Sequence, residues 1–191
     1  MIQNFKLFTL DINVENTKNY YKKVSSEEKC DCLYCQNFYI AIKNVSNDIS
    51  SIFQQLGVDI ECPREIYENC SNADNIVYYG GWYHVCGTII DSKNYFSIYT
   101  LLDQSVSSNE NVSLNTSFRT DCISLNKAGE IIVIDDPTVA SDSLRFSFQN
   151  ECHMLDDIFP KPAIQFNVHI DLPWVLDTPY SGYIDITRNR I

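Results

Sequence analysis

The sequence predicts an α+β fold in which short N-terminal helices pack on a mostly antiparallel β-sheet. Apolar residues recur at helical spacing between residues 35 and 56, and they alternate with polar residues along much of the chain after residue 75. Helices followed by a run of strands are typical of α+β proteins rather than of parallel α/β sheets. A chain of 191 residues, 45% of them hydrophobic, is long enough to form a single domain, residues 1–191, around one core.

The N-terminal segment predicts a strand followed by a connection. Residues 5–14 alternate, with four apolar side chains on one face: Phe8, Leu10, Ile12 and Val14. Residues 15–29 are mostly polar and predict a connection. As an alternative, "NYYKKV" within this range extends the strand.

Two short helices are predicted next. In each, the apolar residues stand at positions i, i+3, i+4 and i+7, which is one helix face. These residues are Cys35, Phe38, Tyr39 and Ile42 in the first helix, and Ile49, Ile52, Phe53 and Leu56 in the second. We expect Ser46 or Asn47 to cap the second helix and Gly57 to end it in the left-handed conformation. Pro63 predicts the start of a third short helix over "REIYEN".

The part of the chain after residue 75 predicts mostly strands. "NIVYYGGWYHVCGTIID" contains two β-rich runs around Gly80-Gly81, where we expect either a tight hairpin or a bulge. "SLNKAGEIIVID" predicts a hairpin that turns near residues 127–129. "YFSIYTLL", "VSLNTSFRT", "SLRFSFQ" and "AIQFNVHIDL" predict further strands, with an apolar face inward and the other face in water. In the last two, the inward residues are Leu144, Phe146, Phe148, Ile164, Phe166, Val168, Ile170 and Leu172.

The charge of the chain restricts its partners. Asp and Glu number 25 against 14 Lys and Arg, which gives a net charge of −11. Such a surface repels phosphate backbones, so we expect no nucleic-acid binding. It attracts a basic protein and accelerates their encounter, or it serves only to keep the protein soluble.

The lack of an export signal and of long apolar segments predicts a cytoplasmic protein, which in turn predicts the state of the cysteines. The start, "MIQNFKLFTLDINVEN", lacks the pattern of an export signal, and no apolar run approaches the roughly 18 residues of a membrane helix. We therefore expect a cytoplasmic protein that does not enter the membrane. In a reducing cytoplasm its eight cysteines are expected as thiols or metal ligands rather than disulfides.

Three of these cysteines form a cluster, Cys30-x-Cys32-x-x-Cys35. Thiolates at this spacing can converge on one zinc ion when a fourth ligand completes a tetrahedron. His84 and Cys86 are the best candidates for that ligand, and both leave the same face of one predicted strand. The predicted structural zinc site is Cys30, Cys32, Cys35 and His84. Cys62, Cys70, Cys122 and Cys152 are scattered and receive no role.

Two other interpretations of the cluster remain open. Cys32 and Cys35 at a helix start would suit redox chemistry, because a helix N-terminus favours the thiolate. The βαβ context usual for such a motif is absent from the sequence. Alternatively, Cys35 is buried as a small hydrophobic residue, and Cys30 and Cys32 belong to a loop that happens to be rich in thiols.

The sequence contains no signature of a known class of enzyme. It has no nucleophile elbow, metalloprotease motif, phosphate loop or dinucleotide fingerprint. His169 and Asp171 share the polar face of a predicted strand and would serve a hydrolase as base and orienting carboxylate, although such residues more often face solvent. His153 stands near Asp156-Asp157, which gives weak support for a divalent metal.

The order of four short motifs resembles an uncharacterised family of small bacterial proteins. The motifs are "CDCLYCQNFY", "LGVDIECPREIYE", "YYGGWYHVCG" and "IDLPWVL", and the similarity spans most of residues 30–176. The resemblance implies a bacterial cytosolic protein and assigns no catalytic role. It also implies that the cysteine cluster and the "GGWYH" strand are shared structural elements.

From these observations we expect a non-enzymatic binding protein. The most specific version is an acidic inhibitor, such as an immunity protein that neutralises a basic toxin, with Tyr or Trp anchors in the interface. The alternatives are a zinc-stabilised structural module and a hydrolytic or redox enzyme.

Overall fold

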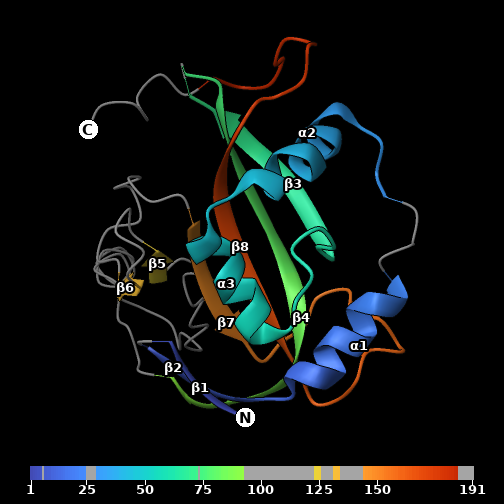
Figure 1. The fold of residues 1–191 in the computed structure, drawn as a ribbon, viewed down its shortest axis with the longest axis vertical. Coiled ribbons are helices and arrows are strands. Elements are labelled where there is room, and N and C mark those ends of the chain that lie inside the picture. The colour runs from blue at the N-terminus through green and yellow to red at the C-terminus, as the bar shows by residue number, and fades with distance from the viewer. Residues whose placement is uncertain are drawn as a thin grey trace, which may run out of the picture.

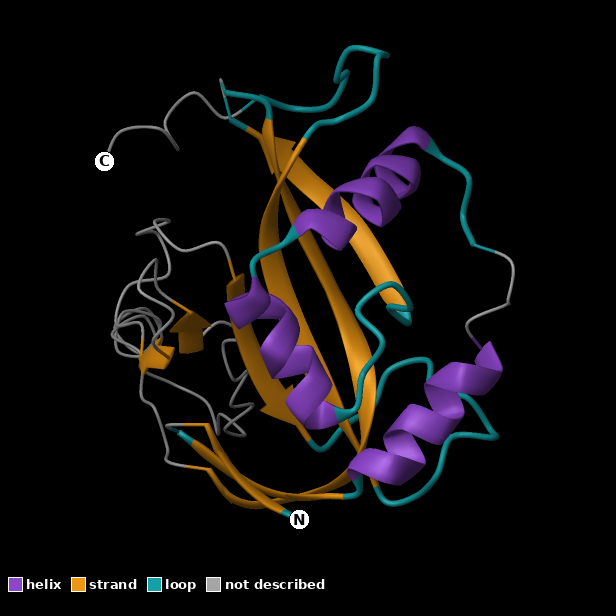
Figure 2. Cartoon of the chain, in the orientation of Figure 1, coloured by secondary structure: helices purple, strands orange, loops and turns teal. Residues whose placement is uncertain are grey.

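The computed structural model describes residues 1–5, 7–24, 29–72, 74–92, 123–125, 131–133 and 144–184, with the two short ranges described by their backbone. Within these residues, helices lie on one side of an eight-stranded sheet (Figure 1 and Figure 2), which confirms the predicted α+β fold. The helical elements are α1 (Val14–Val24), α2 (Leu33–Ala41), the 3₁₀ turn η1 (Ile42–Asn44) and α3 (Asn47–Leu56). The strands are β1 (Ile2–Phe5), β2 (Phe8–Ile12), β3 (Glu65–Ser71), β4 (Ile76–Ser92), β5 (Ile123–Leu125), β6 (Ile131–Val133), β7 (Leu144–Gln149) and β8 (Ala163–Pro173).

β4 is the central strand of the sheet. Its 17 residues pair antiparallel with β8, from Ile76 opposite Pro173 to Cys86 opposite Ala163. It also pairs antiparallel with β3 over its first half and with β2 over its last residues. The path through the sheet is β1-β2-β4-β8-β7-β5-β6, with β3 joined to β4 beside this path.

α1 completes the edge of β4 where no strand pairs with it. Pairing with β3 ends at Trp82 and pairing with β2 begins at Gly87, so the backbone between them needs other partners. The Tyr21 hydroxyl of α1 lies 3.0 Å from both the N–H and the carbonyl of His84. The Thr17 hydroxyl accepts the Cys86 N–H at 3.0 Å, one helical turn earlier.

The connection predicted over residues 15–29 is therefore wrong for its first part, which is helix α1. The signal was present in the sequence. Thr17, Tyr20 and Tyr21 are buried, and together with the half-buried Val24 they stand at i, i+3, i+4 and i+7. The polar residues between them obscured this spacing.

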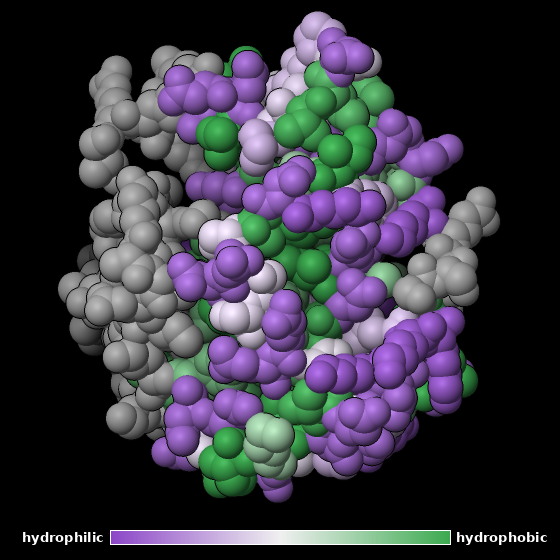
Figure 3. All heavy atoms as spheres, viewed as in Figure 1, coloured by the Kyte–Doolittle hydropathy of each residue, from purple (hydrophilic) through white to green (hydrophobic). Residues whose placement is uncertain are grey.

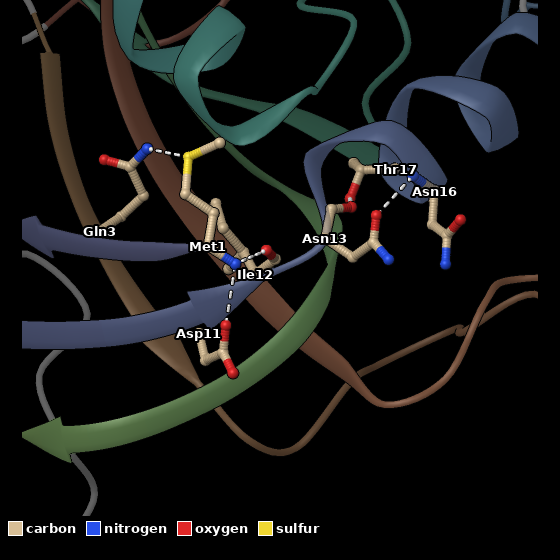
Figure 4. A network of polar contacts seen from close by, with 7 residues as sticks. All are labelled: Met1, Gln3, Asp11, Ile12, Asn13, Asn16 and Thr17. Carbon is tan, nitrogen blue, oxygen red and sulfur yellow. Dashed lines mark hydrogen bonds and ion pairs between the residues drawn. The ribbon is translucent and has the colours of Figure 1, made fainter.

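The N-terminal strand is two strands joined as a hairpin. Leu10 and Ile12 are buried as predicted, but β1 and β2 pair antiparallel from Ile2 opposite Asp11 to Phe5 opposite Phe8. The Met1 amino group binds the Asp11 carboxylate at 2.9 Å and the Ile12 carbonyl at 2.7 Å (Figure 4).

Asn13 separates this hairpin from α1. Its side-chain oxygen accepts the Asn16 N–H at 3.0 Å, and its carbonyl accepts the Thr17 hydroxyl (Figure 4). The strand predicted to run through Val14 ends at Ile12 because these contacts begin the helix.

α2 and α3 confirm the predicted helices. Ser46 caps α3 by accepting the Ile49 N–H at 3.3 Å, and Gly57 ends it with φ of 77°. The predicted face residues of the two helices are buried, except Tyr39, which is half-buried. Hydrophilic residues cover most of the outward side of α1, and hydrophobic residues show between the helices (Figure 3).

Two predictions around the central strands are wrong. The third helix after Pro63 is strand β3, because pairing of residues 65–71 with the edge of β4 overrides local preference. Gly80 and Gly81 form neither a hairpin nor a bulge but lie inside the continuous strand β4. A Cβ at Gly81 would stand 2.3 Å from the Glu65 carbonyl, so the glycine permits close approach of β3.

The core predicted for the C-terminal strands is confirmed. The eight inward residues of β7 and β8 are all buried. The prediction that the other face is wet is wrong for four polar side chains, which are also buried: Arg145, Ser147, Gln165 and Asn167. The side-chain amide oxygen of Gln165 accepts the His153 N–H at 2.7 Å, so residues near His153 pack on this face and supply hydrogen bonds.

The predicted hairpin around residues 127–129 agrees with the antiparallel pairing of β5 and β6. The turn itself and the predicted strands "YFSIYTLL" and "VSLNTSFRT" lie outside the described residues.

The fold gives a first prediction, on Tyr21. Tyr21→Phe keeps the ring in the core but removes the hydroxyl that binds two buried backbone groups of His84. We expect a loss of about 2 kcal/mol in the free energy of unfolding, measured by urea denaturation. Tyr183→Phe, at a side chain that is 70% exposed, is the control and should change stability by less than about 0.5 kcal/mol. Equal stability of Tyr21→Phe and the wild type would contradict the proposed role of α1.

Candidate metal centre

The three cysteines of the predicted cluster meet at the start of α2. Cys30 and Cys32 are exposed in the segment that enters the helix, and Cys32 is its N-cap residue. Cys35 lies in the first turn and is buried against the core. The three Sγ atoms all lie within 4.8 Å of one another, so the cysteines are close enough to bind one metal ion.

The electrostatics of the cluster favour a thiolate on Cys32. The backbone N–H of Cys35, close to the Cys32 sulfur, lowers the pKa of Cys32, and the thiols of Cys30 and Cys35 act in the same direction. Burial raises the pKa of Cys35, and hydrogen bonds with Cys32 and Cys30 add to this effect. The exposed Cys32 therefore ionises more readily than an ordinary thiol, and the buried Cys35 less readily.

A cavity of about 380 Å³ opens beside the cluster. It lies between α1, the segment leading into α2, and the residues that precede β3. Tyr20 and Tyr21 line it from α1, and Tyr39 lines it from α2. Lys29 and Arg64 add two cationic side chains to its wall. The Lys29 ammonium lies 4.7 Å from the centre of the Tyr39 ring.

His84 lines the same cavity but is outside the group of mutually close sulfurs. Side chains alternate along β4, so His84 leaves the face opposite to Tyr79 and Tyr83. α2 packs on the latter face, with the Phe38 and Tyr79 rings 5.5 Å apart. The His84 ring instead packs edge-to-face on Phe159 at 5.6 Å. His84 as the fourth zinc ligand stays a prediction.

The environment of His84 keeps its ring neutral. The side chain is 1% exposed, and its Nε2 has no hydrogen-bond partner among the described residues. Burial lowers the pKa of His84 to about 4, against a small opposing effect of the His153 backbone.

Cys62 lines the cavity together with the three clustered cysteines, although the sequence gave no reason to assign it a role. It closes a turn in which its N–H donates to the Asp59 carbonyl at 3.0 Å. Burial raises the pKa of Cys62 to about 12, and the Asp59 carboxylate 3.5 Å from its sulfur contributes. Cys86, the other predicted alternative to His84, is buried in β4 outside this cavity lining.

The remaining histidines lie on the same side of the sheet as His84, opposite to α2, since His169 pairs with Gly80 of β4 and contacts Tyr78. His169 is half-buried, its Nδ1 meets the Tyr78 hydroxyl, and the Arg145 guanidinium lies 4.7 Å from the centre of the Tyr78 ring. Asp171 is half-buried two residues further along β8, on the same face as predicted. His153 is exposed and its ring contacts Trp82 at 6.3 Å.

No family model, curated protein or solved structure matches the chain. The resemblance of its motifs to an uncharacterised bacterial family therefore stays a prediction. Among the residues that the structure describes, no helix has both the length and the apolar character needed to cross a membrane.

The buried His84 gives a prediction on pH dependence. Its pKa is about 4 in the folded chain and about 6.5 when unfolded, so between these values the unfolded chain binds more protons. The free energy of unfolding should therefore fall as pH falls from 6.5 to 4, by up to about 3 kcal/mol from this residue. Urea denaturation of chelator-treated protein across this range measures the effect.

The variant His84→Gln isolates this contribution. Its pH dependence between pH 4 and 6.5 should be shallower than that of the wild type. Identical slopes for His84→Gln and the wild type would show that His84 does not titrate as a buried group.

Proposed function

We propose that the chain is a zinc-stabilised module in which Cys30, Cys32 and Cys35 bind the ion. The observation that carries the proposal is that the three sulfurs lie within 4.8 Å of one another at the start of one helix. Tetrahedral zinc with Zn–S bonds of about 2.3 Å requires sulfurs about 3.8 Å apart, so a small contraction completes the geometry.

Thiolate chemistry supports zinc in this position. Soft sulfur ligands select zinc, copper(I) or iron–sulfur clusters over magnesium or calcium. The positive end of the α2 dipole stabilises the negative charge of the thiolates. Each thiol that binds releases a proton, so metal binding and ionisation of the buried Cys35 occur together.

The proposal predicts metal-dependent stability. Protein purified under reducing conditions without chelator should contain about one zinc ion per chain, and removal of zinc should lower the thermal midpoint. Cys32→Ser should weaken zinc binding by more than about 100-fold. Loss of a residue that only hydrogen-bonds to a metal ligand already lowers metal affinity by about 10- to 100-fold. Metal analysis and chelator competition measure both effects.

Cys152→Ser is the matched control, because Cys152 is half-buried but does not line the cavity. It should keep the zinc content and affinity of the wild type. A wild-type protein without bound metal that does not take up added zinc would refute the proposal.

We also propose, as a second candidate function, a non-enzymatic inhibitor that binds a basic protein, such as an immunity protein against a basic toxin. The net charge of −11 supports this function, and exposed carboxylates occur on many elements. They include Glu15, Asp31, Asp48, Asp91, Glu151, Asp157 and Asp177.

Partly exposed aromatic residues near the C-terminal end of β8 would supply interface anchors. Tyr34, Trp174 and Tyr180 contact one another edge-to-face at 5.3 to 6.0 Å. Val175 and Tyr183 beside them are 43% and 70% exposed. Aromatic residues of this kind dominate the binding energy of many interfaces. A zinc ion that stabilises the fold is compatible with this function.

The second function predicts association that depends on salt. A basic protein captured from cells that produce the chain should associate more slowly as salt rises, because ions screen the attraction between exposed charges. The triple variant Asp48→Asn, Asp157→Asn, Asp177→Asn should slow association several-fold at low salt, measured by stopped flow. The double variant Lys18→Gln, Lys23→Gln removes exposed positive charge and should have the opposite effect. Association rates that are independent of salt would exclude electrostatic steering.

A further inference from the structure

We propose that Cys62 is the fourth ligand of the metal, which makes the site a closed four-sulfur centre. This inference rests on the proposed zinc site and goes beyond it, because it replaces His84 with a cysteine that the sequence left without a role. Cys62 and the three clustered cysteines all line the one cavity beside α2.

The cavity places Cys62 near the other three sulfurs from a different segment of the chain. Tyr39 of α2 lines this cavity with the four cysteines, and burial raises the pKa of Tyr39 to about 12, with smaller contributions from Cys35, Cys30, Cys62 and Cys32. Lys29 packs on the Tyr39 ring and acts electrostatically on Cys62 as well. A cation at this position balances part of the negative charge that four thiolates place on a zinc site.

Cys62 is better placed to reach the cluster than His84 is. Cys62 belongs to a turn outside the helices and strands, which can shift without breaking sheet pairing. His84 is held in β4 by pairing with Gln165 and by the Tyr21 hydroxyl. Its ring also packs on Phe159, on the face of β4 opposite to α2. Bringing the His84 ring to the cluster would require the central strand to rotate.

The interaction that Cys62 would give up is weak. Its thiol donates to the Asp59 carboxylate at a sulfur–oxygen distance of 3.5 Å, and no described strand or helix depends on this bond. On binding, the Cys62 thiol would lose its proton to solvent and form a sulfur–metal bond, as each of the other three cysteines does. The Cys62 sulfur lies outside the group within 4.8 Å, so the turn must move towards α2 when the metal binds.

Four sulfur ligands would give the metal a definite task. Structural zinc sites have four protein ligands, whereas catalytic sites keep one position open for water or substrate. A metal held by Cys30, Cys32, Cys35 and Cys62 would cross-link the start of α2 to the turn before β3. The ion would then close the cavity and fix the helical layer relative to the edge of the sheet.

Cobalt(II) binding to the full chain tests this assignment. Chelator-stripped wild-type protein is titrated with cobalt(II), and the sulfur-to-cobalt charge-transfer absorbance reports the number of thiolate ligands. We expect Cys62→Ser to lower this absorbance by about a quarter and to weaken cobalt binding by more than about 10-fold. His84→Gln and Cys152→Ser should reproduce the wild-type spectrum and affinity.

The outcomes separate this inference from the proposal on which it rests. Wild-type protein that binds no cobalt would overturn both. Cobalt binding that Cys62→Ser leaves unchanged would overturn only the role of Cys62, and a loss confined to His84→Gln would assign the fourth position to the histidine.

A measurement on the wild type avoids any folding defect of the variant. Iodoacetamide labelling with and without zinc, resolved by mass spectrometry, should show zinc protecting Cys30, Cys32, Cys35 and Cys62 but not Cys152. Equal labelling of Cys62 in both conditions would overturn the assignment.

Discussion

The backbone of β4 imposes the constraint on which the rest of the structure depends. Its 17 residues run through the middle of the sheet, and every buried N–H and carbonyl along it needs a partner. β8 supplies partners along one edge as far as Cys86. On the other side, β3 and β2 leave a gap near His84, and the hydroxyls of Tyr21 and Thr17 fill it. A helix thereby acts as part of the sheet edge, which fixes α1 beside β4 rather than elsewhere on the surface.

This arrangement explains which parts of the fold were predictable from the sequence. The faces of α2 and α3, the cap at Ser46 and the buried residues of β7 and β8 follow from local spacing and are confirmed, apart from Tyr39, which is half-buried. The strand after Pro63 was not predictable in this way, because it exists only through pairing with β4. The hairpin or bulge predicted at Gly80-Gly81 was wrong for a related reason. The glycine serves a close approach between strands that are distant in sequence, and not a local turn.

The ligands of the candidate metal site likewise differ in whether local spacing or tertiary structure brings them together. Cys30, Cys32 and Cys35 are neighbours in the sequence, so their spacing alone predicted that their sulfurs would meet. The fourth position depends on tertiary structure. Spacing on a strand favoured His84, which lines the cavity and packs its ring on Phe159, and the fold also brings Cys62 to this cavity from the turn before β3. The only sequence signal for Cys62 was that it is a cysteine. Because the chain has eight cysteines, residue type alone does not identify which of them is the fourth ligand.

The two helices that cover the sheet differ in how their first turns are stabilised, and the difference bears on the purpose of the metal. α3 has the Ser46 cap and the acidic Asp48 in its first turn. α2 has Cys32 at its N-cap, where a sulfur rather than a hydroxyl or carboxylate oxygen lies near the Cys35 N–H, and its first turn contains no acidic residue. Thiolates bound to a metal would place negative charge at this end of α2, where the helix dipole is positive. The cysteine cluster thus occupies at α2 the position that the Ser46 hydroxyl takes at α3, and a metal there would stabilise the start of α2.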